Sequence, residues 1–439
     1  MRLLSRDPHD REILRLAVPA FGALVAEPLF LLSDSAIVGH LGTAPLGGLG
    51  VAGQALSLLV NLCVFLAYGT TAAVARQVGA GNIARAIQQG IDGIWLAIAI
   101  GAAVLIVGWP LAPWVVDAFG ASAAVAPQAE TYLRISLFGI PGMLVVLAGT
   151  GVLRGLQDTR TPLRVSIGAF TVNLALNALF VLGFGWGIAG SAWGTVLAQS
   201  GGGAVYIAVV LRGARRQNAR VRPDAAGLRA AATAGVNLVL RTISLRVVLT
   251  VGTAVATRMG DAEIAAYQVG FQVWTLLAFA LDAIAIAGQA ITGRYLGAGD
   301  VAGARGATRR MVQWGVASGV VFGVVVLVVR PWLPALFTDD PAVRALLVST
   351  LVVVALLQPM AGVVFVLDGV LIGAGDVRYL AAAGVVTVAA FLPPAWLVSA
   401  RGGGLVALWL AIGVWMTARL LTLGLRARGN AWLVTGAVR

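Results

Sequence analysis

The feature that most constrains this chain is a near-continuous series of apolar stretches, each long enough to cross a lipid bilayer. Hydrophobic residues make up 59% of the 439 residues, charged residues make up 11%, and the mean hydropathy is +0.92. About a quarter of the residues of a soluble domain are charged, so this chain cannot cover a water-facing surface. At about 30 residues for each span and its connection, its length allows about a dozen spans. We therefore expect an all-α integral membrane protein.

Hydropathy predicts twelve transmembrane helices. The expected spans lie near residues 13–39, 50–74, 91–117, 129–153, 162–183, 189–211, 234–257, 264–291, 309–330, 343–372, 378–399 and 404–425. The first apolar run is too long for the h-region of a signal peptide, so we expect it to remain in the mature protein as the first span. Two spans have unusual contents, because 234–257 contains Arg241 and Arg246 and 378–399 contains Pro393 and Pro394.

The basic residues predict the orientation. The net charge is +13 and all 31 basic residues are Arg. With the N-terminus in the cytoplasm, 24 Arg residues fall on the cytoplasmic side and four on the opposite side. The cytoplasmic set includes four near the C-terminus: Arg419, Arg426, Arg428 and Arg439. Positive charge is enriched in cytoplasmic loops, so we expect both termini inside. The charge thus indicates topology, and no nucleic-acid partner is expected.

Sequence motifs recur at a constant offset of 218 residues. The matches are RQVGAGNIARA from Arg76 with RYLGAGDVAGA from Arg294, LRGLQDTR from Leu153 with LIGAGDVR from Leu371, Pro141 with Pro359, Gly42 with Gly260, and Gln54 with Gln272. We therefore expect two six-helix bundles, residues 1–215 and 216–439, related by a parallel internal repeat and joined by an Arg-rich cytoplasmic linker at 212–227. Transporters built from such repeats bind solute between them and work by alternating access.

Two acids interrupt the first span. Glu27 and Asp34 are seven residues apart, which places them within about 20° of one helix face and about 10 Å apart along the axis. Pro28 lacks a backbone donor and is expected to kink or weaken this helix. Ionisable groups within the membrane are expensive and mark functional sites by default. The alternative is that both acids only hydrogen-bond a neighbouring helix.

Other polar residues within spans form two further groups. Asn173 and Asn177 share a face of the fifth span, and Thr195 on the sixth span could add a hydroxyl; amides here can bind a cation or simply join helices. The second half contributes Asp282, Asp368, Gln268 and Gln272. At the repeat offset Asp282 corresponds to Val64 and Asp368 corresponds to Thr150. The two halves thus share a fold but do not share these acidic residues. Interhelical hydrogen bonding is the alternative role for Asp282 and Asp368. Asp92, at a span start, is expected at the membrane interface.

Several function classes lack their residues here. The chain has no Walker A loop, no H-E-x-x-H and no G-x-S-x-G motif, so neither ATP-driven transport nor a membrane hydrolase is indicated. Its only histidines are His9 and His40 and its only cysteine is Cys63, so we expect no His/Cys metal site. We expect no enzyme activity and no cofactor, with the energy supplied by an ion gradient.

The quoted segments resemble the multidrug and toxic compound extrusion (MATE) family. They are EPLFLLSDSAIVGHLG, ARQVGAGN, GVLRGLQDTRTPL, QAITGRYLGAGD and LDGVLIGAGDVRYL, and they are most similar to the DinF-like bacterial branch. The resemblance covers essentially the whole chain. It implies an antiporter in the bacterial inner membrane that exchanges protons or sodium for amphipathic organic substrates, typically cations.

The resemblance also implies site residues. Asp34, Asn173 and Thr195 match a cation site in the N-terminal bundle, and Asn177 stands where many members have Asp. A proton-sharing acid pair is therefore in doubt. Either Asp34 titrates alone, or Glu27 shares its role, or Asp34, Asn173, Asn177 and Thr195 hold one sodium ion. Asp282 and Asp368 match acids of this branch, and the protein is expected to be monomeric.

Three other readings compete. A major facilitator carrier would have an acid in the loop between spans two and three, where this chain has RQVGAGNIARA. A lipid-linked precursor flippase of the wider superfamily would have extra spans or a more cationic cavity. A membrane enzyme or receptor would not need repeated bundles with asymmetric buried acids. The transporter reading fits best, with the flippase as the alternative.

Overall fold

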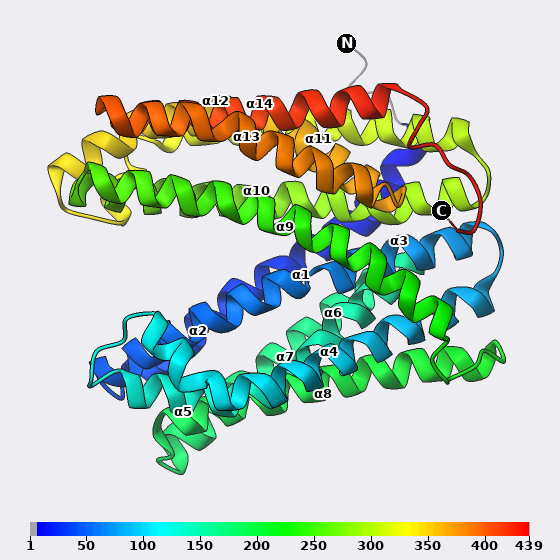
Figure 1. The fold of residues 1–439 in the computed structure, drawn as a ribbon, viewed down its shortest axis with the longest axis horizontal. Helices are drawn as coiled ribbons and strands as arrows, with labels where there is room; N and C mark the ends of the chain where they lie inside the picture. The colour runs from blue at the N-terminus through cyan, green and yellow to red at the C-terminus, as the bar shows by residue number, and fades with distance from the viewer. Residues whose placement is uncertain (1–6, 439) are drawn as a thin grey trace. The chain divides into compact units, whose positions relative to one another are not determined.

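The computed structural model describes residues 7 to 438, apart from the side chain of Glu27. This part of the chain is helical throughout, with short connections (Figure 1). In chain order the elements are α1 (Pro8–Gly39), α2 (Thr43–Cys63), α3 (Phe65–Gly79), α4 (Ile83–Ala118), α5 (Ala126–Leu137), α6 (Ile140–Gly155), α7 (Arg160–Asn177), the π-helix η1 (Ala178–Gly183), α8 (Gly187–Arg216), α9 (Ala225–Met259), α10 (Asp261–Gly297), α11 (Val301–Val329), the 3₁₀ helix η2 (Leu333–Leu336), α12 (Pro341–Gly373), α13 (Val377–Arg401) and α14 (Gly404–Arg428).

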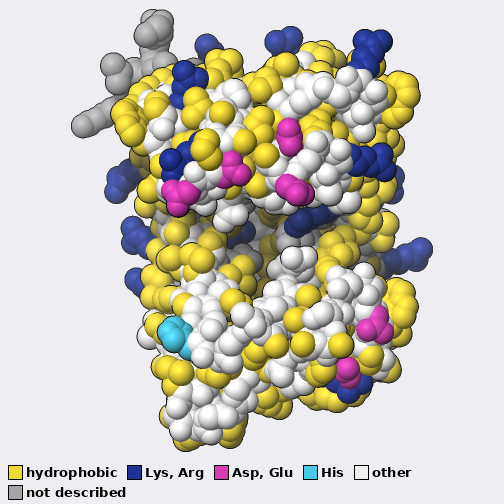
Figure 2. Space-filling view, turned by 90° about the vertical axis from the view of Figure 1, so that its left-hand side faces the viewer, with side chains coloured by type: hydrophobic (Ala, Val, Ile, Leu, Met, Phe, Trp, Pro, Cys, Tyr) yellow, Lys and Arg dark blue, Asp and Glu magenta, His cyan; other side chains and the backbone are white. Residues whose placement is uncertain are grey.

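The helices match the predicted fold class. Within the described range, eleven segments are long and apolar enough to cross a membrane, with α2 and α3 together forming one of them. Helices α5 and α6, bent by 53° at their junction, form the twelfth. Most helices extend past the predicted spans: α10 has 37 residues, about 55 Å, against a hydrocarbon thickness of about 30 Å. Hydropathy marks only the part of a helix inside the hydrocarbon. Figure 2 shows one face of the molecule, where hydrophobic side chains lie among acidic and basic side chains.

The chain divides into two compact units. We call residues 22–235 the N-terminal unit, and residues up to 21 together with 236–437 the C-terminal unit. Helices α1 and α9 contribute residues to both units. In the C-terminal unit, α12 is the most deeply buried of the candidate spans and packs against α10, α11 and α14. The predicted halves, 1–215 and 216–439, describe the sequence repeat and stay a prediction.

The backbone repeats at the offset found in the sequence. Residues in the left-handed region occur in pairs 218 apart: Gly42 with Gly260, Gly81 with Gly299, and Gln157 with Gly375. Each pair lies in a tight turn between helices, where a positive φ is needed and glycine adopts it without strain. Gln157 has φ 64° although it is not a glycine, so this turn has the same backbone conformation in both halves. The repeat therefore specifies turn geometry as well as sequence.

A glycine packs against a proline at the same place in both halves. A Cβ added to Gly101 on α4 would lie 2.5 Å from the Cα of Pro141 on α6. In the second half, a Cβ on Gly319 of α11 would lie 2.7 Å from the Cα of Pro359 on α12. No side chain fits at that distance, so glycine lets each helix pair approach closely, as small residues do at membrane helix interfaces.

Helices of the N-terminal unit are interrupted where those of the second half continue. Val64 separates α2 from α3, whereas its repeat counterpart Asp282 lies within the unbroken α10. The bend between α5 and α6 precedes Pro141, whereas α12 runs through Pro359. Proline is compatible with both outcomes because it removes one hydrogen bond without fixing how the helix adjusts.

The Arg-rich linker is held against α4. Trp95 donates its indole N–H to the carbonyl of Val221 (3.2 Å), and the backbone N–H of Asp224 donates to Asp92 (2.9 Å). Asp92 is buried, not placed at an exposed interface, because its carboxylate binds the backbone at the start of α9. The linker at 212–227 is thus anchored at its C-terminal end.

Candidate coupling site

Asp34 lies at the centre of a buried hydrogen-bond network in the N-terminal unit. Asp34 on α1 is 1% exposed, and Asn173 and Asn177 on α7 are fully buried. The Asn177 amide donates to Oδ1 of Asp34, and the Thr195 hydroxyl on α8 donates to Oδ2 (3.3 Å). The Asn173 amide donates to Thr195 (3.1 Å), and the Asn177 amide also reaches Oδ1 of Asn173 (3.4 Å). The structure thus brings these four predicted residues together.

The end of α7 positions the two amides. Asn173 and Asn177 are one helical turn apart and project from the same face. Asn177 is the last α-helical residue, and the chain continues as the π-helix Ala178–Gly183. Such wide turns are rare and occur often at functional sites. The local change of helix type therefore coincides with the residue that contacts Asp34.

The site also contains residues that the sequence analysis missed. A Cβ on Gly194 of α8 would lie 2.1 Å from the side-chain oxygen of Asn177, so only glycine fits beside this amide. The Tyr132 hydroxyl, from α5, lies beside Thr195, Ser136 and Ser191. Tyr132 and these three neighbours are all buried. Hydroxyls surround the network, and each can switch between donating and accepting.

The fit of a sodium ion to these residues depends on how the amides are turned. A sodium site needs oxygens directed at one point, but Asn177 presents its amide nitrogen to Asp34 and to Asn173. Both carboxylate oxygens of Asp34 already accept hydrogen bonds. The four predicted residues form a hydrogen-bond network instead.

The other two predicted residues of α1 lie one to two turns before Asp34. Pro28 is half-buried, and α1 is assigned as one uninterrupted helix across it. The side chain of Glu27 lies outside the described residues. The seven-residue spacing of the two acids on one helix is confirmed, but their joint role stays a prediction.

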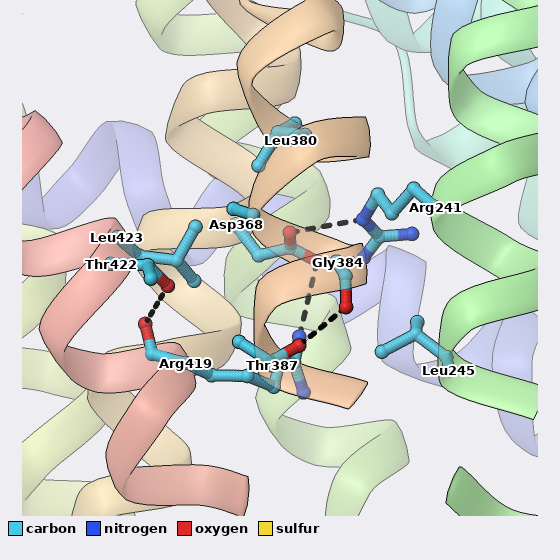
Figure 3. Close-up of a pocket in the computed structure, with 10 residues that line it drawn as sticks. Arg241, Leu245, Asp368, Leu380, Gly384, Thr387, Arg419, Thr422 and Leu423 are labelled. Carbon is cyan, nitrogen blue, oxygen red and sulfur yellow. Dashed lines mark hydrogen bonds and ion pairs between the residues drawn. The ribbon is translucent and has the colours of Figure 1, made fainter. Parts of the chain in front are cut away.

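A second polar cluster lies in the C-terminal unit, around Asp368 on α12. Arg241 on α9 binds it with two nitrogens, one at 3.1 Å, and Arg419 on α14 lies 3.5 Å from the same carboxylate. Asp282 on α10 attracts Arg419 electrostatically. Figure 3 shows both guanidinium groups directed at Asp368. These three side chains line a cavity of about 20 Å³, which is room for about one water molecule.

One expectation about this unit needs correction, and one group of predicted residues is divided. Arg419, assigned to the cytoplasmic end of the chain, is buried within α14, because Asp368 attracts it into the helix bundle. Gln268 and Gln272 on α10 do not join the acids; both are exposed in this structure. The predicted group of Asp282, Asp368, Gln268 and Gln272 therefore separates into a buried ion-pair cluster and an exposed pair of amides.

Comparison with known proteins identifies the family. The MatE family matches residues 19–179 and 238–397, two segments offset by nearly the repeat distance. The chain belongs to the MATE family. This confirms the resemblance seen in the sequence and excludes the major facilitator reading.

Relatives and solved structures agree with this assignment. The chain is 30% identical over 425 residues to Protein DETOXIFICATION 44, chloroplastic, of Arabidopsis thaliana, covering 93% of this chain and 80% of the relative. It is 29% identical over 427 residues to DNA damage-inducible protein F of Escherichia coli, covering 94% and 91%. The crystal structure of the Vibrio cholerae MATE transporter VcmN in the bent form has a TM-score of 0.87 at 23% identity, covering 96% and 98%.

Membership places the chain among multi-pass membrane transporters for multidrug and toxic compound efflux. MATE transporters use ion gradients and handle small organic substrates. The family is one of transporters.

Proposed function

We propose that the protein is a secondary active antiporter that exports amphipathic organic compounds in exchange for protons, by alternating access. The observation that carries the proposal is the environment of Asp34. Among the described residues, its hydrogen-bond partners are the neutral Asn177 and Thr195. A buried carboxylate without a cation is costly, so binding a proton stabilises it, and releasing one requires access to water.

The network can accept that proton without losing its hydrogen bonds. The Asn177 amide can donate to one carboxyl oxygen in either state. Once the other carboxyl oxygen carries a proton, its O–H can donate a hydrogen bond to the Thr195 oxygen, because a hydroxyl both donates and accepts. The hydrogen of Thr195 then turns toward the oxygen of Tyr132 beside it. The neighbouring hydroxyls thus give the site two hydrogen-bonded arrangements that differ by one proton.

Proton binding is proposed to alter α1 near Pro28. Proline leaves a helix one hydrogen bond short, and this residue lies two turns or fewer from Asp34. The solved VcmN structure is described as a bent form, which supports bending as a motion open to this fold. Glu27, beside Pro28, is proposed to share the coupling role, and sodium held by Asp34, Asn173, Asn177 and Thr195 is the competing assignment.

The membrane and orientation complete the proposal. The distribution of Arg residues favours both termini in the cytoplasm, and the similarity to DNA damage-inducible protein F of Escherichia coli favours a bacterial inner membrane. We propose that a single chain suffices for transport, because its two halves supply the repeat that alternating access uses.

Transport in liposomes tests the function. Purified protein would be reconstituted and the movement of a fluorescent cationic dye recorded under a proton gradient or a sodium gradient, with Asp34→Asn alongside. Asp117→Asn, at an exposed acid near the end of α4, is the matched control. We expect proton-driven movement that is lost in Asp34→Asn and kept in Asp117→Asn.

The other outcomes discriminate between assignments. Movement driven only by sodium would overturn proton coupling and favour the four-residue sodium site. Wild-type rates in Asp34→Asn would remove the coupling role of this residue. No movement under either gradient would contradict antiport of such dyes and favour a lipid-linked precursor flippase, whose substrates would be tested next.

A further inference from the structure

One arginine in the middle of a membrane helix has no partner in the described structure. Arg246 lies on α9, half-buried, and takes part in no ion pair or hydrogen bond among residues 7 to 438. It is 21 residues after the start of α9 and 13 before its end, about 32 Å and 20 Å along the helix. Neither end is within reach of its side chain. A charge at this depth normally faces a water-filled cavity and meets a partner there.

The two acids within the spans of the same unit, Asp282 and Asp368, already interact with other arginines. Asp368 binds Arg241 and lies beside Arg419, and Asp282 attracts Arg419. These two acids and two arginines balance in charge. Arg246 therefore leaves the membrane-embedded part of the C-terminal unit with one positive charge in excess.

Arg246 belongs to a polar stripe that is separate from the buried face of α9. At 100° per residue, Thr242, Arg246, Thr253 and Thr257 fall within about 60° of one another. The buried residues Arg241, Ser244 and Val248 lie on another side of the helix. All four stripe residues are half-buried or exposed. The hydroxyls of Thr242, Thr253 and Thr257 donate to carbonyls of their own helix, so the guanidinium of Arg246 supplies the free donors of this stripe.

The neighbouring helix α10 carries further polar residues. Gln268, Gln272 and Thr275 recur at i, i+4 and i+7 and are half-buried or exposed. The Tyr267 hydroxyl joins the two helices, because it packs against Gly252 and lies beside Thr253. The two predicted glutamines that do not reach the acids thus lie on the helix that packs against the stripe of Arg246.

We propose that this stripe, with Arg246 as its charged residue and with Gln268 and Gln272 on the adjacent helix, binds an anionic group of the transported solute. The solute class is an amphipathic organic anion or zwitterion that carries a carboxylate. A guanidinium presents paired donors that match a carboxylate, and the amides of the glutamines add donors for its other oxygens. Because the carboxylate supplies the charge that the unit lacks, solute binding removes the cost of the unpaired arginine.

Binding and transport together test the proposal, which rests on the proposed transport function. The binding of a carboxylated fluorescent dye and of a cationic dye would be measured by fluorescence anisotropy, with the full-length protein in nanodiscs of zwitterionic lipid. The variants are Arg246→Gln, Arg246→Lys and, as a matched control at the exposed end of the same helix, Arg258→Gln. Size-exclusion profiles would confirm that each variant is folded.

We expect Arg246→Gln to weaken binding of the carboxylated dye at least tenfold while the cationic dye binds as before. Arg246→Lys should keep most of the affinity, and Arg258→Gln should bind as the wild type does. The proposal is overturned if the wild type does not bind the carboxylated dye, or if Arg246→Gln binds it normally. It is also overturned if the effect occurs only in nanodiscs with anionic lipid, which would assign Arg246 to a lipid phosphate.

The Asp34→Asn variant separates this proposal from the coupling proposal. It should bind the carboxylated dye normally but fail to move it under a proton gradient. Loss of coupling with intact binding supports both proposals. Intact gradient-driven transport in Asp34→Asn contradicts the coupling role alone, and the Arg246 binding result still stands or falls by itself.

Discussion

The amide of Asn177 donates directly to the carboxylate of Asp34. A neutral donor therefore occupies the position where the resemblance to MATE transporters implied a second acid in many members. The contact satisfies Asp34 without sharing its charge, and it joins α7 to α1 beside the π-helix that begins at Ala178. How Asp34 holds a proton should depend on this one side chain.

Replacing Asn177 by Asp should alter the pH dependence of transport. Two adjacent carboxylates cannot both ionise easily, so the pair would retain a proton to higher pH than Asp34 does alone. We expect the pH at which proton-driven transport falls to half to move upward in Asn177→Asp. Rates in liposomes over a series of internal and external pH values would measure this. An unchanged profile would mean that residue 177 does not influence the coupling acid.

Gly194 should be essential for this geometry. A methyl group at 194 would meet the side-chain oxygen of Asn177 at 2.1 Å, so Gly194→Ala must displace Asn177 from Asp34. We expect at least a tenfold loss of proton-driven transport with little loss of membrane insertion. Gly201→Ala on the same helix is the control, because nothing lies within 4 Å of its added Cβ. Equal activity of the two variants would show that the position of Asn177 is unimportant.

The buried pair of Arg241 and Asp368 should be more costly to break than to remove. Either single change, Arg241→Met or Asp368→Leu, leaves a buried charge with fewer partners, a loss of about 3–5 kcal/mol. The double variant removes the pair together, and we expect it to be closer to the wild type than Arg241→Met is. Thermal unfolding in detergent would measure the order of stability. If the double variant lost the sum of both single effects, the two residues would not be coupled.

The sequence singled out the members of the Asp34 network because they stand out against apolar helices, and the resemblance to the MATE family grouped them into one site. Asp34, Asn173, Asn177 and Thr195 are polar residues in spans that contain few others, and helical spacing placed the two amides on one face. Gly194 carried no such signal, since it is one of 56 glycines and its importance lies in a contact with another helix. The sequence also did not predict the bend before Pro141. A proline stands at the equivalent position of both halves, yet α12 continues through Pro359 without a break.

The second cluster shows what sequence reasoning cannot supply. Arg241 and Asp368 are 127 residues apart, and only packing of α9 against α12 brings them together. Arg419 was assigned to the cytoplasmic side because it lies in the last part of the chain. The positive-inside rule counts charges by position along the chain, and it cannot recognise an arginine that a buried acid holds within the bundle.

The glycine–proline contacts of the two halves should be required for stability. A Cβ at Gly319 would lie 2.4 Å from the carbonyl oxygen of Gln358, which is backbone and cannot move aside alone. We expect Gly319→Ala to separate α11 from α12 and to cost about 1–3 kcal/mol, the usual range for overpacking. Gly424→Ala is the control, with open space around its Cβ. Matching unfolding temperatures for the two variants would contradict close packing at Gly319.

Pro28 should affect the rate of transport more than the affinity for substrate. Alanine at 28 restores the missing backbone donor and makes α1 a regular helix, which should oppose bending near Asp34 while leaving the surfaces that contact solute unchanged. We expect Pro28→Ala to slow proton-driven turnover several-fold with dye affinity within about twofold of the wild type. Pro110→Ala, at an exposed proline inside α4, tests whether any helix proline has this effect. Unchanged turnover in Pro28→Ala, or equal slowing in Pro110→Ala, would remove the bending of α1 from the mechanism and leave proton exchange at Asp34 to act through side-chain rearrangement alone.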